Sequence, residues 1–230
     1  MLLPLRTRLD AALLTRPPRL LHALLPGCEW TGPARAANGA PVVYLTFDDG
    51  PIPEETPWVL EQLAAFDARA TFFCVGENLT RYPEIARATL AAGHRLGNHT
   101  QRHRSAWVST RAGYLQDIAE CQAELAGLGL APAIGLEAPE LLFRPPYGRL
   151  TWPLLRALRS RYRIAMWSVL TRDYDPDLSP ENCLVSTLAT VRAGDIVVFH
   201  DSRKASARLR FVLPRLLAHL AAQGFQFATL

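Results

Sequence analysis

From position 41 onward, the chain alternates short apolar runs with segments whose apolar positions recur every three to four residues. The runs are rich in β-branched and aromatic residues, which is typical of buried strands, and the recurring pattern indicates amphipathic helices. Regular alternation of the two predicts βα units around a parallel sheet or barrel. The expected strands cover residues 42–47, 70–75, 95–97, 141–143, 162–169, 195–199 and 225–229.

Local signals mark several helix ends. Thr56-Pro57 and Ser179-Pro180 each pair an N-cap residue with a proline suited to the first helical position, for helices that reach Phe66 and Val191. Residues 127–140, rich in glycine, alanine and proline, predict a loop. Glycine favours the left-handed backbone that ends a helix, and the glycines expected to do so are Gly93, Gly127 and Gly224.

Length and composition fit one globular α/β domain. The chain has 230 residues, 49% of them hydrophobic and 20% charged, and a chain of this size buries a single large core. We place the main domain at residues 39–230, after an extension of residues 1–38. Arginines interrupt any signal-peptide core in this extension. We expect two short amphipathic helices there that pack on the main domain, with a membrane surface as the alternative; their apolar faces carry Leu9, Leu13, Leu20 and Leu24.

Charge and cysteine content exclude several classes of partner. The net charge is only +4, Lys204 is the sole lysine, and no basic stripe with interleaved aromatics indicates nucleic-acid binding. No run approaches the roughly 20 apolar residues of a membrane span. The four cysteines form no CxxC pair, so neither a zinc ribbon nor a redox motif is predicted. A cytoplasmic location is favoured, with the cell envelope as the alternative, and the oligomeric state stays open.

Chemically reactive side chains follow five of the expected strands at their carboxyl ends. In a (β/α) barrel these ends meet at one face, where active sites are built. Scattered polar residues would have no reason to choose the same end repeatedly, so we expect a common site. Its candidate residues are Asp48, Asp49, His99, His103, Arg144, Asp173 and His200.

The spacing of two of these residues indicates a metal site. His99 and His103 lie four apart, which on a helical turn puts both imidazoles on one side. Together with a strand-end carboxylate they form a two-histidine, one-aspartate set with open positions for water and substrate. Zinc in such a set activates water, whereas iron(II) oxygenases use the same ligands. A solvated pair of histidines is the plain alternative.

The adjacent carboxylates Asp48 and Asp49 make sense if one binds the cation and the other accepts a proton from the attacking water. The Gly50-Pro51 turn would let both reach the mouth of the barrel, although an Asp-Gly-Pro sequence also forms ordinary turns. Arg144 can pair with the carboxylate that does not bind the metal. In RPPYG the two prolines lack N–H groups, so the Tyr147 amide is the first free donor and could face an oxyanion.

His200 ends a strand and is a natural general acid for a departing amine. A neighbouring carboxylate would orient its ring and raise its pKa. Both Asp173 and Asp201 are candidates for that carboxylate, and the sequence does not choose between them.

The run at 202–210, SRKASARLR, either starts the last helix on its solvated side or favours acidic glycans near the mouth.

In this order, the five segments resemble the motifs of the polysaccharide deacetylase family, carbohydrate esterase family four, over residues 41–230. The resemblance implies a catalytic domain whose fold is an α/β, distorted (β/α) barrel of seven or eight mostly parallel strands. TFDDGP implies Asp48 as the base and Asp49 as a metal ligand. The remaining motifs imply His99 and His103 as the other ligands, Arg144 as the residue that steadies Asp48, the Tyr147 amide as the oxyanion donor, Asp173 as the residue that tunes the acid, and His200 as the acid.

The fourth and fifth motifs depart from the usual family patterns, which are Asp-x-x-Asp-Trp for the fourth motif and Leu-x-x-His for the fifth. Leu170 replaces the first Asp, Tyr174 the Trp, and Val197 the Leu. Tyr174 and Val197 keep an apolar lining, so the acetyl pocket is expected to survive with altered shape. The residues expected to line the oxyanion and substrate pocket are Tyr147, Tyr174, Val197 and Trp167.

The resemblance implies a metal-dependent hydrolase that removes N-acetyl groups from a glycan containing N-acetylglucosamine, either chitin-like or peptidoglycan. The expected cofactor is a divalent metal, Zn²⁺ first, with Co²⁺, Ni²⁺ or Mn²⁺ as alternatives. An O-acetyl esterase on the same site, a catalytically silent glycan-binding module and an iron oxygenase remain alternative functions.

Overall fold

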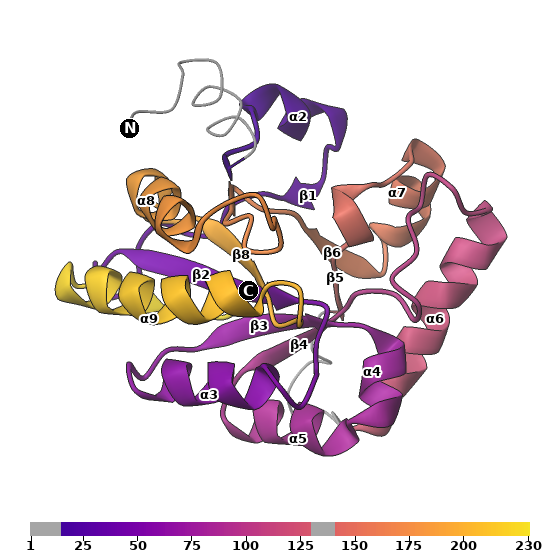
Figure 1. Ribbon diagram of the computed structural model, residues 1–230. Coiled ribbons are helices and arrows are strands. Elements are labelled where there is room, and N and C mark those ends of the chain that lie inside the picture. The colour runs from indigo at the N-terminus through magenta and orange to yellow at the C-terminus, as the bar shows by residue number, and fades with distance from the viewer. Residues whose placement is uncertain (1–14, 130–140) are drawn as a thin grey trace.

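The computed structural model describes residues 15–129 and 141–230, and these form a nine-stranded parallel sheet (Figure 1). Along the sheet the strands run β1-β6-β5-β4-β3-β2-β8-β7, and β9 pairs with β2. The eight strands of this path form a curled half-barrel, which confirms the expected distorted barrel. Their bounds are β1 Cys28–Glu29, β2 Val42–Asp48, β3 Ala70–Cys74, β4 Arg95–Asn98, β5 Leu141–Phe143, β6 Tyr162–Ala165, β7 Val169–Leu170, β8 Ile196–His200 and β9 Gln226–Phe227.

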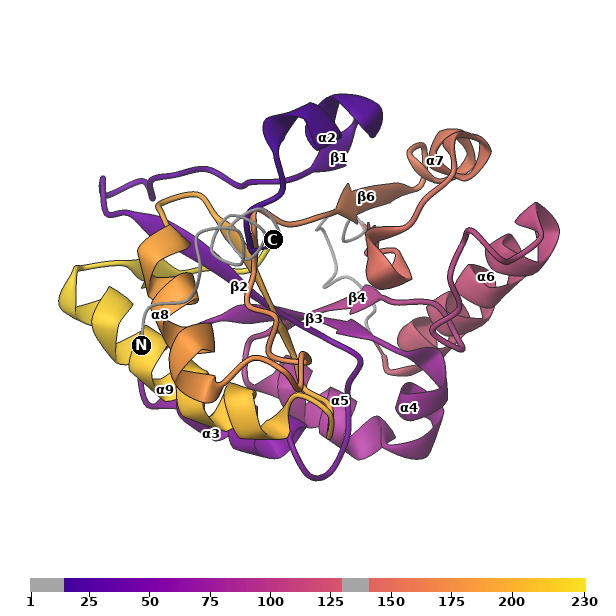
Figure 2. The ribbon, with the colours of Figure 1, turned by 45° about the horizontal axis from the view of Figure 1, so that its top comes forward.

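Helices cover the outside of the curled sheet and contact one another in the order α8, α9, α3, α5, α4, α6, α7 (Figures 1 and 2). This is the arrangement that right-handed βα units produce. The bounds are α2 Arg19–Leu24, α3 Thr56–Ala64, α4 Gly76–Arg81, α5 Pro83–Ala91, α6 Arg111–Gly127, α7 Trp152–Leu158, α8 Pro180–Thr190 and α9 Ser206–Ala222, and a 3₁₀ turn η1 spans Pro146–Gly148.

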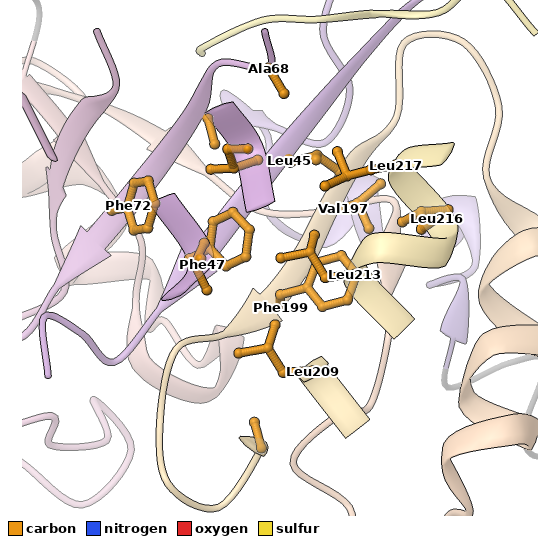
Figure 3. Packing of buried hydrophobic residues seen from close by; sticks show 14 of the residues in the cluster. Leu45, Phe47, Ala68, Phe72, Val197, Phe199, Leu209, Leu213, Leu216 and Leu217 are labelled. Atoms are coloured by element: carbon orange, nitrogen blue, oxygen red, sulfur yellow. The ribbon is translucent and has the colours of Figure 1, made fainter. Parts of the chain in front are cut away.

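The central strands are buried on both faces, which explains their continuous apolar sequences. Residues alternate between the faces, so one set packs outward against α9 and the other points into the half-barrel. The outward set forms the main core shown in Figure 3, which includes Leu45, Phe47, Val197, Phe199, Leu209 and Leu213. Asp48 and His200 are register partners at the ends of β2 and β8. Both therefore end up at the same mouth of the half-barrel.

The strand expected at 162–169 is two strands in the structure. β6 pairs with β1 and β5, whereas β7 pairs with β8. Between them the backbone changes partner, because the Met166 N–H donates to Glu29 O and the Ser168 N–H donates to Ile196 O. The chain thus crosses from one end of the strand order to the other, and the half-barrel is open between β1 and β7. The two-residue strand β1 was not expected, since it is too short to show a pattern.

Two expected helix ends differ from the structure. Helix α3 begins at Thr56 with Glu55 at the N-cap position, and Thr56 Oγ1 is hydrogen-bonded to Asp201 rather than capping the helix. Gly127 is the last residue of α6, and Gly129 instead takes the left-handed φ of 82°. At α8 the expectation is confirmed, because the Ser179 hydroxyl accepts a hydrogen bond from the Asn182 N–H.

The segment before β1 is joined to the domain by polar and aromatic contacts. Arg16 forms an ion pair with Asp195, and the rings of His22 and Trp30 stack at 4.3 Å. Leu20 and Leu24 are exposed, so this apolar pair does not provide the packing. Leu9, Leu13 and most of the expected loop, residues 130–140, lie outside the described residues. Among the helices that the structure describes, none is long and apolar enough to cross a bilayer.

Candidate active site

The two carboxylates of the first motif lie at the end of β2, where the backbone reverses. Asp49 adopts a φ of 83°, in the left-handed region, and the Asn78 side-chain amide donates to its carbonyl oxygen at 2.7 Å. This reversal carries both Asp48 and Asp49 to the mouth, although consecutive residues of a straight strand would face opposite sides. Both side chains line a cleft at this mouth.

Asp201 holds this turn in place, a role that sequence reasoning did not assign. Its side chain is fully buried and accepts the Gly50 N–H at 3.0 Å and the Thr56 hydroxyl at 2.5 Å. Burial raises the pKa of Asp201 to about 8, and the hydrogen bonds from Thr56 and Gly50 offset this only in part. A Cβ on Gly50 would come within 2.0 Å of Asp201 Oδ2, so the turn needs glycine here.

Asp49, His99 and His103 come together as a group. Asp49 Oδ1 lies 3.2 Å from His103 Nε2 and 3.8 Å from His99 Nε2. One ligand atom from each residue fits within 4.8 Å of the other two, which is the spacing that a common cation requires. These three residues are the metal-ligand set that the sequence predicts.

The two histidines do not lie on a helical turn, in contrast to the expectation. Residues 99–110 form an irregular loop, in which Thr100 and His103 have positive φ values of 65° and 52°. The buried Asp117 of α6 supports this loop: its backbone oxygen accepts the Gln101 N–H at 2.9 Å and its carboxylate accepts the Arg102 N–H at 3.2 Å. Tertiary contacts, rather than helical spacing, therefore bring the imidazoles to the same side.

The protonation and hydrogen bonding of the group fit a metal ion. His99 Nδ1 lies 2.8 Å from the Arg144 carbonyl oxygen and can donate to it, which leaves Nε2 as an acceptor facing Asp49. Burial lowers the pKa of His99 to about 4, so this imidazole is neutral at pH 7. Asp49 Oδ1 is buried and has no hydrogen-bond partner among the described residues. A cation would satisfy this oxygen, and one carboxylate with two imidazoles is a donor set typical of catalytic zinc.

Asp48 is paired with a completely buried arginine. Arg144 Nη1 donates to Asp48 Oδ1 and to Thr46 Oγ1, both at 2.7 Å. The rest of the guanidinium is fixed by the carbonyl oxygens of Ala165 and Met166. Burial alone would raise the pKa of Asp48, but the charge and hydrogen bond of Arg144, together with the nearby histidines, outweigh it and hold that pKa below its ordinary value of 3.8. Asp48 is thus an ionised carboxylate with Oδ2 left for another partner.

The carboxylate that lies beside His200 belongs to Asp173. Asp173 Oδ1 lies 2.7 Å from His200 Nδ1, and Oδ2 accepts the His200 backbone N–H at 2.8 Å. Burial would lower the pKa of His200, but the charge and hydrogen bond of Asp173 outweigh it and raise that pKa to about 9. His200 is therefore an imidazolium at neutral pH, with Nε2–H free to face the cleft.

A cleft of about 550 Å³ surrounds these groups. Of the four expected lining residues, Tyr147, Tyr174 and Trp167 line it and Val197 does not. Val197 is fully buried in the outward core, because it stands three residues before His200 and so faces the other side of the strand. Val198, two residues before His200, lines the cleft instead. Counting strand parity from His200 would have identified it.

The RPPYG segment forms the tight turn η1. Tyr147 takes a left-handed φ of 60° and is 60% exposed as a residue, and its ring packs edge-on against His103 at 4.8 Å. The N–H groups of Gly148 and Arg149 donate to Pro145 and Pro146. No described residue accepts a hydrogen bond from the Tyr147 N–H, so that donor stays available beside the ligand group.

Residues 35–161 match the family model described as polysaccharide deacetylase. The chain belongs to this family. A peptidoglycan-N-acetylglucosamine deacetylase of Bacillus cereus is 31% identical over 84% of the chain and 87% of that protein. A chitooligosaccharide deacetylase of Sinorhizobium fredii is 34% identical over 83% of the chain and 91% of that protein.

Solved structures agree with the family assignment. The crystal structure of the Bc1960 peptidoglycan N-acetylglucosamine deacetylase matches with a TM-score of 0.75 at 29% identity, over 91% of this chain and 93% of that one. Family membership confirms the deacetylase class expected from the sequence, and this family of hydrolases is metal-dependent. The arrangement of Asp49, His99 and His103 is consistent with that dependence.

Proposed function

We propose that the protein removes N-acetyl groups from N-acetylglucosamine residues of a glycan, with a divalent cation, zinc first, held by Asp49, His99 and His103. The observation that carries this proposal is that the three ligands line one cleft together with an ionised carboxylate, Asp48, and an imidazolium, His200. A bound cation supplies Lewis acidity, which activates water and polarises the acetyl carbonyl group. The two relatives named above act on peptidoglycan and on chitooligosaccharides, respectively, which supports a glycan substrate.

The residues divide the reaction between them. Asp48 accepts a proton from the attacking water while Arg144 holds its carboxylate in place. As the water oxygen bonds to the acetyl carbon, the Tyr147 N–H stabilises the oxyanion. His200 then donates its Nε2 proton to the sugar nitrogen as the C–N bond breaks, and Asp173 stabilises the imidazolium beforehand. The products are acetate and a glucosamine residue with a free amine.

Acetate release tests the proposal. Protein stripped with a chelator should release no acetate from N-acetylglucosamine oligomers or peptidoglycan fragments, and zinc, cobalt or manganese should restore release to different extents. Asp48→Asn should bind the metal but lose turnover by at least about 100-fold. A variant at Asp67, an exposed surface aspartate, serves as the matched control, and Asp67→Asn should behave as wild type. Full activity of Asp48→Asn would refute the base assignment. Faster release from acetylxylan than from chitin oligomers would favour the O-acetyl esterase.

A further inference from the structure

Two walls of the cleft carry the same kinds of side chain, a tyrosine and a cation. On one wall, the ring of Tyr147 packs edge-on against His103, and the Arg149 guanidinium lies over the Tyr147 ring at 5.5 Å. On the other wall, the ring of Tyr174 packs edge-on against His200 at 5.0 Å, and the Lys204 ammonium lies over the Tyr174 ring at 5.5 Å. Each wall thus carries a tyrosine beside a residue of the reaction centre and a cation beyond the tyrosine.

These walls lie on opposite sides of the mouth. Arg149 follows β5 through the turn η1, whereas Lys204 follows β8. In the strand order, β4, β3 and β2 separate β5 from β8. Because the active-site carboxylate and ligands stand at the ends of those intervening strands, Arg149 and Lys204 flank the reaction centre.

Both cations are held by aromatic rings rather than by acids. Arg149 also stacks on the exposed ring of Trp107 at 4.8 Å. Among the residues that the structure describes, neither Arg149 nor Lys204 has an acidic partner within ion-pair distance, whereas Arg203, the residue before Lys204, is paired with Glu54. A cation–π contact fixes a cationic side chain while leaving its N–H donors unsatisfied. Two positioned and unpaired cations at the edge of a binding cleft favour an anionic ligand.

The acids of the reaction centre do not neutralise these two cations. Asp48 is already paired with Arg144, and Asp49 belongs to the ligand group. Neither acid is paired with Arg149 or Lys204. Arg149 and Lys204 are therefore not used by the reaction centre, although both line the same cleft.

We propose that Arg149 and Lys204 bind carboxylates carried by the sugars that flank the N-acetylglucosamine in the cleft. This inference rests on the proposed function and deepens it, because it selects an anionic glycan over a neutral one. In a peptidoglycan strand from which the peptides have been removed, every second sugar carries a free lactyl carboxylate, so the strand presents one carboxylate on each side of an N-acetylglucosamine. A cation on each wall matches that alternation, and the tyrosine and tryptophan rings offer faces for the pyranose rings.

Three tetrasaccharides separate charge from shape. The first alternates N-acetylglucosamine with N-acetylmuramic acid bearing free carboxylates, the second is the same glycan with each carboxylate converted to an N-methylamide, and the third is the neutral N-acetylglucosamine tetramer. For the metal-loaded wild-type protein at low salt, we expect kcat/KM to be about five-fold higher on the free acid than on the methylamide, as two partly exposed ion pairs allow. High ionic strength should reduce this ratio.

Substitutions assign the preference to residues. Lys204→Gln and Arg149→Gln should each lower the acid-to-methylamide ratio, and the double variant should bring it close to one. Arg203→Gln, a change beside Lys204 but in a residue already paired with Glu54, should leave the ratio unchanged. Because the ratio compares two substrates on one protein, a loss of folded protein does not alter it.

The outcomes also separate this inference from the proposed function. Equal turnover of the acid and the methylamide by wild type, or an acid preference that survives the double substitution, would overturn the role of the two cations and leave deacetylation intact. No acetate from any of the three glycans would overturn the proposed function, and this inference with it.

Discussion

Replacing Asp173 with asparagine isolates its effect on His200. Asparagine keeps the size of the side chain but removes the negative charge, and its single oxygen can accept only one of the two hydrogen bonds that Asp173 accepts from His200. In the wild type, burial lowers the pKa of His200, but the charge and hydrogen bond of Asp173, with smaller contributions from Asp49 and Asp48, raise it to about 9. Without the Asp173 charge, burial still lowers this pKa, which should fall towards its ordinary value of 6.5.

The size of the effect follows from the two pKa values. A general acid must be protonated, so its contribution is full below its pKa and is lost as the pH rises through it. At pH 8, about 90% of His200 is protonated with a pKa of about 9, but only about 3% with a pKa of 6.5. The kcat of Asp173→Asn at pH 8 should therefore be about thirty-fold below that of the wild type. A bound dication would lower both pKa values, so the difference between the proteins persists.

The assay is the pH dependence of kcat for acetate release, measured on the metal-loaded proteins. The basic limb of the profile should move to lower pH in Asp173→Asn, and activity should recover partly as the pH is lowered. Asp175→Asn is the matched control, because Asp175 lies two residues away and pairs with Arg172. Loss of activity with no movement of the basic limb would refute the assignment of His200 as an acid tuned by Asp173.

Two further substitutions test the supports of the site. Gly50→Ala places a methyl group within 2.0 Å of the buried Asp201 carboxylate, and overpacking of this kind should lower the free energy of unfolding by about 1–3 kcal/mol. Gly127→Ala is the control: nothing lies close to Gly127, so this substitution should not lower the free energy of unfolding. Arg144→Gln leaves Asp48 buried without a charged partner, which should cost about 3 kcal/mol at pH 7. That cost should shrink as the pH falls towards 3.8, because protonated Asp48 needs no cation; chemical denaturation at pH 7 and pH 4 measures it, and an equal cost at both would contradict the account.

The sequence predicts the bounds of a strand well where the strand is buried on both faces and its sequence is therefore continuously apolar. β2, β3 and β5 are apolar on both faces, and their bounds lie within one residue of the expected ranges. The break between β6 and β7 leaves no such mark, because it depends on which neighbouring strand offers its backbone groups at Met166 and Ser168. Local composition specifies a buried strand, whereas partner choice is set by the assembled sheet.

In the site, too, some features follow from the sequence and others depend on tertiary contacts. The reactive residues could be found because parallel strands bring their carboxyl ends together, and the ligand group assembles although its histidine loop is not helical. The positive φ of His103 depends on support from Asp117, which is distant in sequence. Val198, rather than Val197, follows from the parity of β8. The role of Asp201 requires the spatial meeting of β2 and β8, which no local pattern encodes.

The most direct test of the central claim is the position of the metal itself. Crystals of the protein grown with zinc, measured on both sides of the zinc absorption edge, give an anomalous difference map that locates the ion. The account predicts one strong peak about 2.0–2.2 Å from Asp49 Oδ1 and from Nε2 of both His99 and His103. A protein that turns over substrate while its zinc peak lies away from these three atoms would contradict the account.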